Sequence, residues 1–245
     1  DFSGTVAALG EGVTEWAVGD EVYGHPPIFS SGTYAEYTTV PASACARKPV
    51  SIDHVHAAAV PLTGLTAWQA LFEHAQLQPG QRVLIQSGAG GVGSFAIQLA
   101  KARGLHVIST ASTGNLDLLR ELGADQVIDY NAVQFEKEVS GVDAVIDGMA
   151  GEVRERSWKT LKPGGLLIAL TGAPPTDATA AEHGYRQTTM LVHPDRVQLT
   201  EIAALIDAGK VRPILEAVIP LAETARAHRL SEGGHARGKI VLQVV

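Results

Sequence analysis

One glycine-rich stretch, residues 83–93, most constrains what this chain can fold into. It reads VLIQSGAGGVG, in which Gly88, Gly90 and Gly93 fit the spacing G-x-G-x-x-G and Gly91 adds a further glycine. An apolar strand is expected before this turn and an amphipathic helix after it. Such a turn lets the backbone approach a pyrophosphate closely and aims a helix N-terminus at its charge. The pattern predicts a dinucleotide site, and the alternative is a purely structural turn.

Composition narrows the class of protein further. The chain has 245 residues, 45% hydrophobic and 18% charged, which suits an α/β protein with a sizeable core. The formal charge of −7 disfavours nucleic acid or an anionic membrane as the main partner. Cys45 is the single cysteine, so neither an internal disulfide nor a cysteine-based zinc cluster can form, and a reducing compartment is expected. No apolar run approaches the roughly 20 residues of a membrane helix. We therefore expect a cytoplasmic protein.

The first 48 residues indicate β structure. Strands are expected at residues 6–9, 21–23 and 34–39, separated by glycine and proline turns. They resemble a small barrel with too few strands to close, so we expect that chain is missing before Asp1. Residues 53–77 are expected to be helical, with breaks at Pro61 and Gly64.

From residue 82 onward, strand and helix patterns alternate. Strands are expected at 82–86, 106–110, 126–128, 144–146, 166–170 and 186–191, and helices at 91–103, 115–122, 134–139, 152–161 and 195–208. Residues 171–184 form a Gly/Pro/Thr/Ala-rich loop. This alternation predicts a doubly wound parallel sheet, the Rossmann type of α/β fold, with the glycine turn at the carboxyl edge of its first strand.

The C-terminal segment follows a different pattern. A strand at 214–219, a helix at 221–230 and a strand at 240–245 are expected to pack back onto the first domain. The predicted domains are therefore residues 1–57 with 213–245, and residues 58–212.

The stretch after the second strand bears on the cofactor. An NAD site usually has Asp or Glu there to hold the ribose hydroxyls, but residues 107–113 read VISTAST. Small hydroxyl side chains leave room for a 2′-phosphate, which favours NADPH. Ser112 either contacts the cofactor or only caps the next helix.

Eight short motifs in the right order resemble one family. They are DFSGTV (1–6), GDEVYG (19–24), GTYAEY (32–37), LTAWQAL (65–71), GAGGVG (88–93), LGAD (122–125), KPGG (162–165) and GKIVL (238–242). Together they resemble the medium-chain dehydrogenase/reductase superfamily, and specifically its zinc-free, zeta-crystallin-like quinone oxidoreductase branch. The resemblance implies a partial GroES-like β-barrel domain for substrate and a Rossmann domain for NADPH. It also implies that roughly 60 residues, with part of the substrate pocket, precede Asp1.

The residues at the zinc positions of the superfamily argue against a metal. Asp1 falls where zinc-dependent relatives carry a glutamate, and Leu62 falls at a cysteine ligand, which leucine cannot replace. The four-cysteine structural lobe is absent. His54 and His56 lack a closed set of ligands, so we expect them in a solvated loop.

The resemblance also implies which residues contact the cofactor. The backbone at the glycine turn would hold the pyrophosphate, Tyr130 would lie near the adenosine 2′-phosphate, and residues 170–172 and 63–66 would approach the nicotinamide. The alternative for Thr63 is capping of a helix, and Lys239 either reaches a phosphate or lies in a solvated strand. The predicted cofactor-binding residues are Thr63, Gly88, Ala89, Gly90, Gly91, Val92, Gly93, Ser112, Tyr130, Leu170, Thr171 and Lys239.

One departure from the family pattern weakens the preference for NADPH. Relatives often carry Lys or Arg just after the Ser/Thr stretch, where this chain has Gly114 and Asn115. Arg120 lies more than a helical turn further on. We expect NADPH to bind more tightly than NADH, with NADH tolerated.

The predicted activity is hydride transfer from NADPH to a quinone or α,β-unsaturated carbonyl without zinc. No catalytic residue is assigned, although Tyr34 and Tyr37 are candidate proton donors. The alternatives are an enoyl-thioester reductase and a non-enzymatic NADPH-binding module. The absence of G-x-S-x-G and of a Walker motif disfavours a hydrolase and a P-loop protein. The strand at 186–191 is expected at a sheet edge, where it predicts a homodimer.

Overall fold

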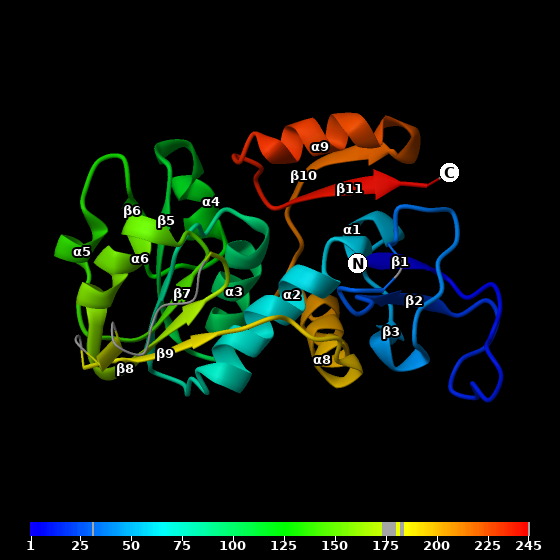
Figure 1. Cartoon of the computed structure of the whole chain (residues 1–245), viewed down its shortest axis with the longest axis horizontal. Helices are drawn as coiled ribbons and strands as arrows, with labels where there is room; N and C mark the ends of the chain where they lie inside the picture. The colour runs from blue at the N-terminus through cyan, green and yellow to red at the C-terminus, as the bar shows by residue number, and fades with distance from the viewer. Residues whose placement is uncertain (31, 173–179, 182–183, 245) are drawn as a thin grey trace. The chain divides into compact units, whose positions relative to one another are not determined.

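The computed structural model describes residues 1–30, 32–172, 180–181 and 184–244 (Figure 1). Most of the predicted loop at 171–184 lies outside the described residues. By its contacts the chain divides into two units, one formed by Asp1–Leu65 with Val192–Val245 and the other by Thr66–Leu191. The predicted domain boundaries, at 57/58 and 212/213, stay a prediction.

A six-stranded parallel sheet forms the centre of the unit Thr66–Leu191. Its strands are β4 (Arg82–Ile85), β5 (His106–Ala111), β6 (Gln126–Asp129), β7 (Val142–Asp147), β8 (Leu161–Ala169) and β9 (Arg186–Thr189), in the order β6-β5-β4-β7-β8-β9. The chain winds outward from β4 in both directions, so the strand order reverses beside β4. This topology confirms the predicted doubly wound fold, whose ligands bind at such a reversal.

Helices alternate with these strands. They are α2 (Pro61–Trp68), the π-helix η2 (Gln69–His74), α3 (Gly91–Ala102), α4 (Leu116–Glu121), α5 (Phe135–Glu138) and α6 (Gly151–Ser157), with 3-10 turns η3 (Thr113–Asn115) and η4 (Trp158–Thr160). Helix α3 contacts β4 and β5, and α4 contacts β5 and β6. Gly64 lies inside α2 and does not break it, contrary to the prediction, whereas Pro61 begins that helix, as proline favours the first turn.

Both faces of the central strands are buried. Leu84, Val145 and Leu167 join a cluster that includes Phe135 and Trp158. The residues that alternate with them along the strands are equally inaccessible to solvent: Val83, Ile85, Ile146 and Ile168. Successive side chains of a strand point to opposite faces, so burial of both sets explains why these strands are continuous apolar runs.

Strand β8 begins earlier than its sequence indicates. Pro163, Gly164 and Gly165 were expected to separate a helix from a strand at 166–170, but they lie within β8. The pairing with β7 shifts register between Val142 and Ala144, and Gly164 has φ of +73°. The three residues therefore form a bulge inside the strand instead of a loop before it.

The other unit contains two small sheets. Strands β1 (Phe2–Thr5), β2 (Glu21–Gly24) and β3 (Cys45–Arg47) are antiparallel, and β10 (Leu215–Pro220) pairs in parallel with β11 (Lys239–Gln243). The helices are η1 (Ala42–Ala44), α1 (His54–Ala58), α8 (Arg196–Asp207), η5 (Leu221–Glu223) and α9 (Thr224–Glu232). Tyr23 on β2 donates a hydrogen bond of 2.6 Å to the carbonyl of Leu199 on α8, which ties the N-terminal and C-terminal parts of this unit together.

Two predicted strands in this unit are wrong. Residues 6–9 follow β1 without forming a strand, and residues 7–9 are exposed. Residues 34–39 are also irregular, with Tyr34 and Tyr37 63% and 78% exposed. Alternation of apolar and polar residues gives a strand only where a neighbouring strand supplies a ladder and a surface to pack on. Among the described residues, no helix is both long and apolar enough to cross a membrane.

Candidate functional site

The glycine turn connects β4 to α3 and is anchored to β5. The amides of Ser87 and Gly88 donate to the hydroxyl and carbonyl oxygens of Thr110, at 3.3 and 2.9 Å, and the Gly90 amide donates to the Ser87 carbonyl at 3.0 Å. Ser87 has φ of +57°, a conformation that few residues other than glycine adopt. The turn is thus held by backbone hydrogen bonds at the point where the strand order reverses.

Two of its glycines are required by packing. A Cβ on Gly93 would lie 2.3 Å from the carbonyl oxygen of Ser87 and 2.7 Å from the Cα of Gly88. A Cβ on Gly88 would lie 2.1 Å from the Ser109 hydroxyl. Neither atom fits, so α3 can approach β4 and β5 this closely only with glycine at both positions.

The other residues of the turn leave the start of α3 open. Gly90 is the N-cap and its φ and ψ of −76° and 176° are accessible to any residue. A Cβ there would meet only Ser87, at 3.4 Å or more. No side chain caps α3, whose first intrahelical bond runs from the Ser94 amide to the Gly90 carbonyl. The amides of Gly91 and Val92 therefore lie in the first turn, where a helix offers no acceptor and attracts an anion. These residues fit a pyrophosphate.

Three buried polar side chains form a hydrogen-bonded series that ends at Thr110, the residue that anchors the turn. The Thr110 hydroxyl donates to Gln86 Oε1 at 2.6 Å, and Gln86 Nε2 donates to the Ser157 hydroxyl at 3.1 Å. All three side chains are at most 4% exposed. The sequence interpretation missed them, although a glutamine and a threonine in otherwise apolar strands were a signal that could have found them.

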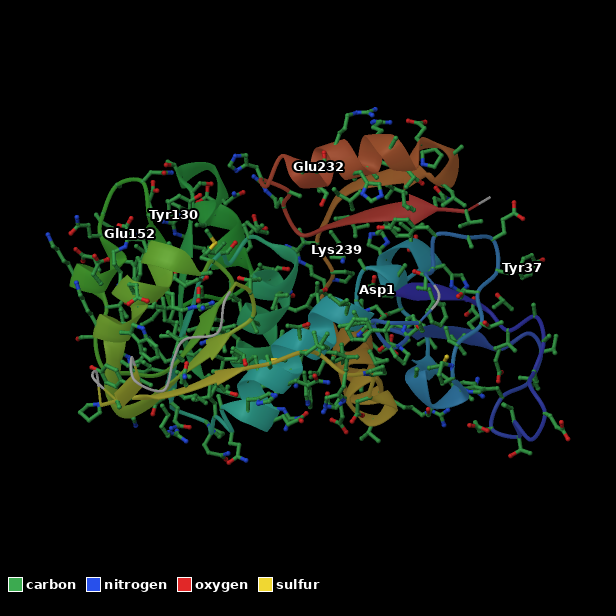
Figure 2. All side chains as sticks on the ribbon, in the orientation of Figure 1. Asp1, Tyr37, Tyr130, Glu152, Glu232 and Lys239 are labelled. Carbon is green, nitrogen blue, oxygen red and sulfur yellow. The ribbon has the colours of Figure 1, made fainter. Side chains whose placement is uncertain are left out.

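Side chains from two neighbouring strand ends meet beside the turn. Ala111 and Asp129 are paired residues at the ends of β5 and β6, and the Tyr130 amide donates to the Ala111 carbonyl at 3.2 Å. Ser112 therefore lies close to Tyr130, whose side chain is 48% exposed at the surface (Figure 2). The Ser112 hydroxyl accepts from Asn115 Nδ2 at 3.1 Å and makes no capping hydrogen bond to a backbone amide, so the capping interpretation is wrong and cofactor contact stays a prediction.

A carboxylate that the sequence interpretation missed occupies the same place. Thr113 donates through its hydroxyl to Asp129 Oδ2 at 2.6 Å, and the Asn131 amide donates to Asp129 Oδ1 at 2.9 Å. These hydrogen bonds, that of Thr113 first, hold the pKa of Asp129 below its usual value. Asp129 is the last residue of β6, whereas the acidic residue of a dinucleotide site usually follows the second strand, so the sequence pattern did not predict a carboxylate here.

A buried ion pair shapes the loops after β7 and β8. Arg154 Nε lies 2.5 Å from Asp147 Oδ2, and both side chains are at most 5% exposed. Arg154 also donates to the carbonyl of Thr171, and the Leu170 amide donates to the carbonyl of Asp147 at 2.9 Å. The pair thus fixes the backbone at residues 170–171, the segment predicted to face the nicotinamide.

The same carboxylate stabilises a strained turn. Asp147 Oδ1 accepts from the amides of Met149 and Ala150, at 2.9 and 3.1 Å. Ala150 has φ of +59°, and a Cβ on Gly172 would lie 2.6 Å from the Ala150 side chain. The two loops therefore pack in direct contact. The sequence interpretation missed this arrangement because Asp147 and Arg154 belong to no motif.

Two predicted cofactor residues, Thr63 and Lys239, lie in the other unit. The buried Thr63 hydroxyl donates to the Ala59 carbonyl at 3.1 Å, the bond of a helical threonine. Lys239 Nζ lies 3.9 Å from Asp1 Oδ2, and burial lowers the pKa of this lysine. Figure 2 labels both partners of that pair.

That unit also contains a hollow large enough for a small molecule. A cavity of about 820 Å³ is lined by β1, β11 and residues 33–42, with Asp1, Tyr34 and Lys239 among its lining side chains. The Tyr34 ring lies 6.0 Å from the ring of His228. Tyr34 therefore lines this hollow, and its candidacy as a proton donor stays a prediction.

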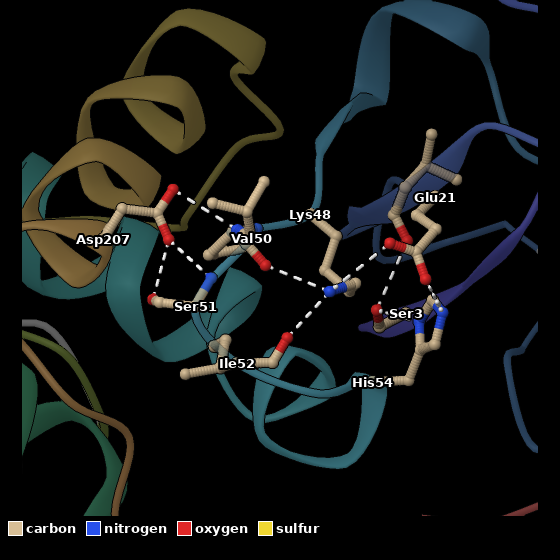
Figure 3. A network of polar contacts seen from close by, with 10 residues as sticks. Ser3, Glu21, Lys48, Val50, Ser51, Ile52, His54 and Asp207 are labelled. Atoms are coloured by element: carbon tan, nitrogen blue, oxygen red, sulfur yellow. Dashed lines mark hydrogen bonds and ion pairs between the residues drawn. The ribbon is translucent and has the colours of Figure 1, made fainter.

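The histidines considered as metal ligands have protein partners. His54 contacts the Ser3 hydroxyl at 2.8 Å and Glu21 Oε1 at 3.1 Å (Figure 3). His56 pairs with Asp53 at 2.7 Å. Within the described ranges of the chain, no group of three or more His, Cys, Asp and Glu side chains could hold a metal ion.

Comparisons with known proteins place this fold in a family. Residues 122–242 match the family described as zinc-binding dehydrogenase, and residues 1–50 match the alcohol dehydrogenase GroES-like domain. The chain is 34% identical over its whole length to the mitochondrial NAD(P)H oxidoreductase RTN4IP1 of Danio rerio, of which it covers 71%. The chain belongs to the medium-chain dehydrogenase/reductase superfamily. The resemblance seen in the sequence is thereby confirmed, and the chain is an oxidoreductase of this superfamily.

Solved structures of the superfamily agree with the fold. The quinone oxidoreductase from Coxiella burnetii superposes with a TM-score of 0.92 at 36% identity, over 100% of this chain and 78% of that one. The mycobacterial protein Rv1454c, complexed with NADPH, gives a TM-score of 0.87 at 31% identity, over 98% and 80% of the two chains. Members of this medium-chain family are NAD(P)H-dependent oxidoreductases.

Proposed function

We propose that the chain transfers hydride from NADPH to a quinone or an α,β-unsaturated carbonyl compound without zinc. The observation that carries the proposal is the uncapped N-terminus of α3, which the close-packed glycines hold at the reversal of the strand order. The named activities of relatives support the acceptor class. They include the quinone oxidoreductase of Coxiella burnetii and the NADPH-dependent alkenal/one oxidoreductase of Arabidopsis thaliana, which is 36% identical.

The proposed cofactor contacts follow the edge of the sheet. The backbone from Gly88 to Gly93, Ala89 included, would hold the pyrophosphate, and the amides of Gly91 and Val92 point there as part of the first helical turn. Ser112 and Tyr130 would contact the adenosine end, and Leu170 and Thr171 the nicotinamide end. Thr63 and Lys239, which lie in the other unit, are proposed on the family resemblance alone. When bound, NADPH supplies the hydride, and the protein supplies position and polarity.

The proposed preference for NADPH over NADH rests on residues 107–113, which form most of β5 and the two residues after it. These residues carry no acidic side chain to hold ribose hydroxyls. The structural relative Rv1454c is complexed with NADPH. We propose that this chain binds both dinucleotides and NADPH more tightly.

A zinc-free mechanism rests on the residues at the superfamily's metal positions. Leu62 offers no ligand atom, and its amide donates to Asp1 Oδ2 at 3.3 Å. The product of quinone reduction can take its proton from water, so no side chain is required for that step. We propose Tyr34, which lines the hollow together with Lys239, as the side chain that protonates an enolate.

The activity test is NADPH oxidation, followed by absorbance, with a panel of quinones and enones. We expect turnover with members of the panel that a zinc chelator does not abolish. Oxidation of simple alcohols that requires added zinc would contradict the proposal. Saturable NADPH binding without turnover across the panel would favour the alternative of a non-enzymatic binding module.

An enoyl-thioester reductase is the second candidate. The crystal structure of CurK enoyl reductase superposes with a TM-score of 0.86 at 27% identity, over 99% of this chain. This activity would use the same cofactor edge and a different substrate. Reduction of an enoyl thioester at a higher kcat/KM than any quinone or simple enone would select it.

We further propose a homodimer. Strand β9 is an edge of the six-stranded sheet, and an exposed edge can pair with its copy. Sedimentation equilibrium tests this, and a monomer at micromolar concentration would contradict it. A cytoplasmic location also stays a prediction, since several relatives are named as mitochondrial or chloroplastic proteins.

A further inference from the structure

The Asp129 carboxylate is the feature of the candidate cofactor edge that the proposed function leaves unused. It lies at the end of β6, where its Cα pairs with that of Ala111 at the end of β5. The strand β5 leads into Ser112 and Thr113, the segment where dinucleotide folds meet the adenosine ribose. The segment at the end of β5 has no acidic side chain of its own. Asp129, at the end of the neighbouring strand β6, supplies a negative charge there.

The charge is fixed in position. The Thr113 hydroxyl and the Asn131 amide donate to its two oxygens, at 2.6 and 2.9 Å. Two donors on one carboxylate stabilise its ionised form and hold its orientation. The same hydrogen bond turns the Thr113 hydroxyl toward Asp129, so that this donor is already occupied.

No cation among the described residues forms an ion pair with this carboxylate. Among the described residues, none of the ion pairs includes Asp129. Arg120, the nearest arginine that follows this segment in the chain, is paired with Asp117 on α4 at 2.6 Å. A 2′-phosphate of NADPH at this end of the site would meet a fixed negative charge without a compensating positive one, whereas the ribose hydroxyl of NADH would not.

We propose that Asp129 is a specificity-determining residue of the cofactor site, which weakens NADPH binding by charge repulsion and thereby narrows the preference for NADPH over NADH. The inference rests on the proposed function, because it needs a dinucleotide in this edge of the sheet. It assigns the narrowed preference to one side chain.

The test compares dissociation constants for NADPH and NADH, measured by fluorescence titration of the 245-residue chain. In Asp129→Asn the shape is kept and the charge removed. We expect NADPH to bind about 3- to 6-fold more tightly and NADH to change less than about 2-fold, from the interaction of unit charges about 4–6 Å apart in a water-like medium. Asp117→Asn, the same charge change on α4, is the matched control and should alter neither constant by more than about 2-fold.

Ionic strength provides a readout that a purely structural role would not move. The screening length falls from about 14 Å at 0.05 M salt to about 6 Å at 0.3 M, so the gain in NADPH affinity should shrink at the higher concentration. Equal changes for both cofactors in Asp129→Asn, or no change, would overturn the inference. A loss of NADH affinity alone would also overturn it, because Asp129 would then be a ribose ligand. If the unaltered chain binds neither cofactor, the proposed function itself fails.

Discussion

A buried ion pair in one unit and a buried histidine in the other are satisfied in different ways. In Thr66–Leu191, Asp147 and Arg154 neutralise each other and bond to the backbone of two loops. In the unit that contains both chain ends, His25 is 2% exposed, and its Nε2 has no hydrogen-bond partner among the described residues. The buried ion pair is favourable only while both Asp147 and Arg154 are present. The burial of His25 depends on pH, because a protonated imidazole without a partner is costly to bury.

The largest effect should come from breaking the buried pair. Arg154→Met leaves the Asp147 carboxylate buried without its counter-ion, which should cost about 3–5 kcal/mol of unfolding free energy. Urea denaturation measures it. Arg120→Met, which breaks an exposed pair with Asp117, is the control and should cost less than about 1 kcal/mol. Similar losses in the two variants would mean that the buried pair does not hold these loops.

Close packing of the glycine turn gives the next largest effect. Gly93→Ala places a Cβ against backbone atoms of Ser87 and Gly88, so the backbone must shift, and we expect a loss of about 3 kcal/mol. Gly148→Ala is the control, since nothing lies within 4 Å of its added Cβ and its φ is not positive. Calorimetric melting of both variants distinguishes packing at the turn from a general intolerance of substitution.

The unit that contains both chain ends should lose folding stability on acidification, because it buries His25. Burial lowers the pKa of His25 to about 4, against about 6.5 in the unfolded chain. Because the folded pKa is the lower one, this stability is complete above pH 6.5 and is lost as the pH falls toward 4. By linkage, about 2 kcal/mol should be lost between pH 7 and pH 5.

The variant His25→Gln isolates this contribution in urea unfolding at the two pH values. It should lack the loss, whereas His56→Gln, which removes an exposed histidine paired with Asp53, should retain it. An undiminished loss in His25→Gln would assign the acid sensitivity to other groups, and the comparison between the units would no longer hold.

The same contrast separates what the sequence could predict from what it could not. The parallel sheet was predictable because burial on both faces makes each strand a continuous apolar run. The glycine turn was predictable because Gly88 and Gly93 lie where no Cβ atom fits. The predicted strand at 34–39 was wrong because, among the described residues, its alternation meets no neighbouring strand. Local pattern cannot reveal whether a partner strand exists.

The candidate site shows the same limit at the level of single residues. The turn could be found from its spacing, but Asp129 reaches the cofactor edge through the pairing of β5 with β6, and Arg154 meets Asp147 and Thr171 only after the chain has folded back. These contacts join residues with no common motif. They follow from strand order and register, which single positions in a sequence do not specify.

The most direct test of the central claim, that the turn at residues 87–93 holds a dinucleotide pyrophosphate, is the dissociation constant of NADPH for Gly90→Ala. The fold tolerates this Cβ, so melting should stay within about 0.5 kcal/mol of the parent chain, yet the methyl group would occupy the place of closest approach to the phosphates. We expect NADPH affinity to fall at least about tenfold, or about 1.4 kcal/mol. A stable Gly90→Ala chain that binds NADPH as tightly as the parent would contradict the account.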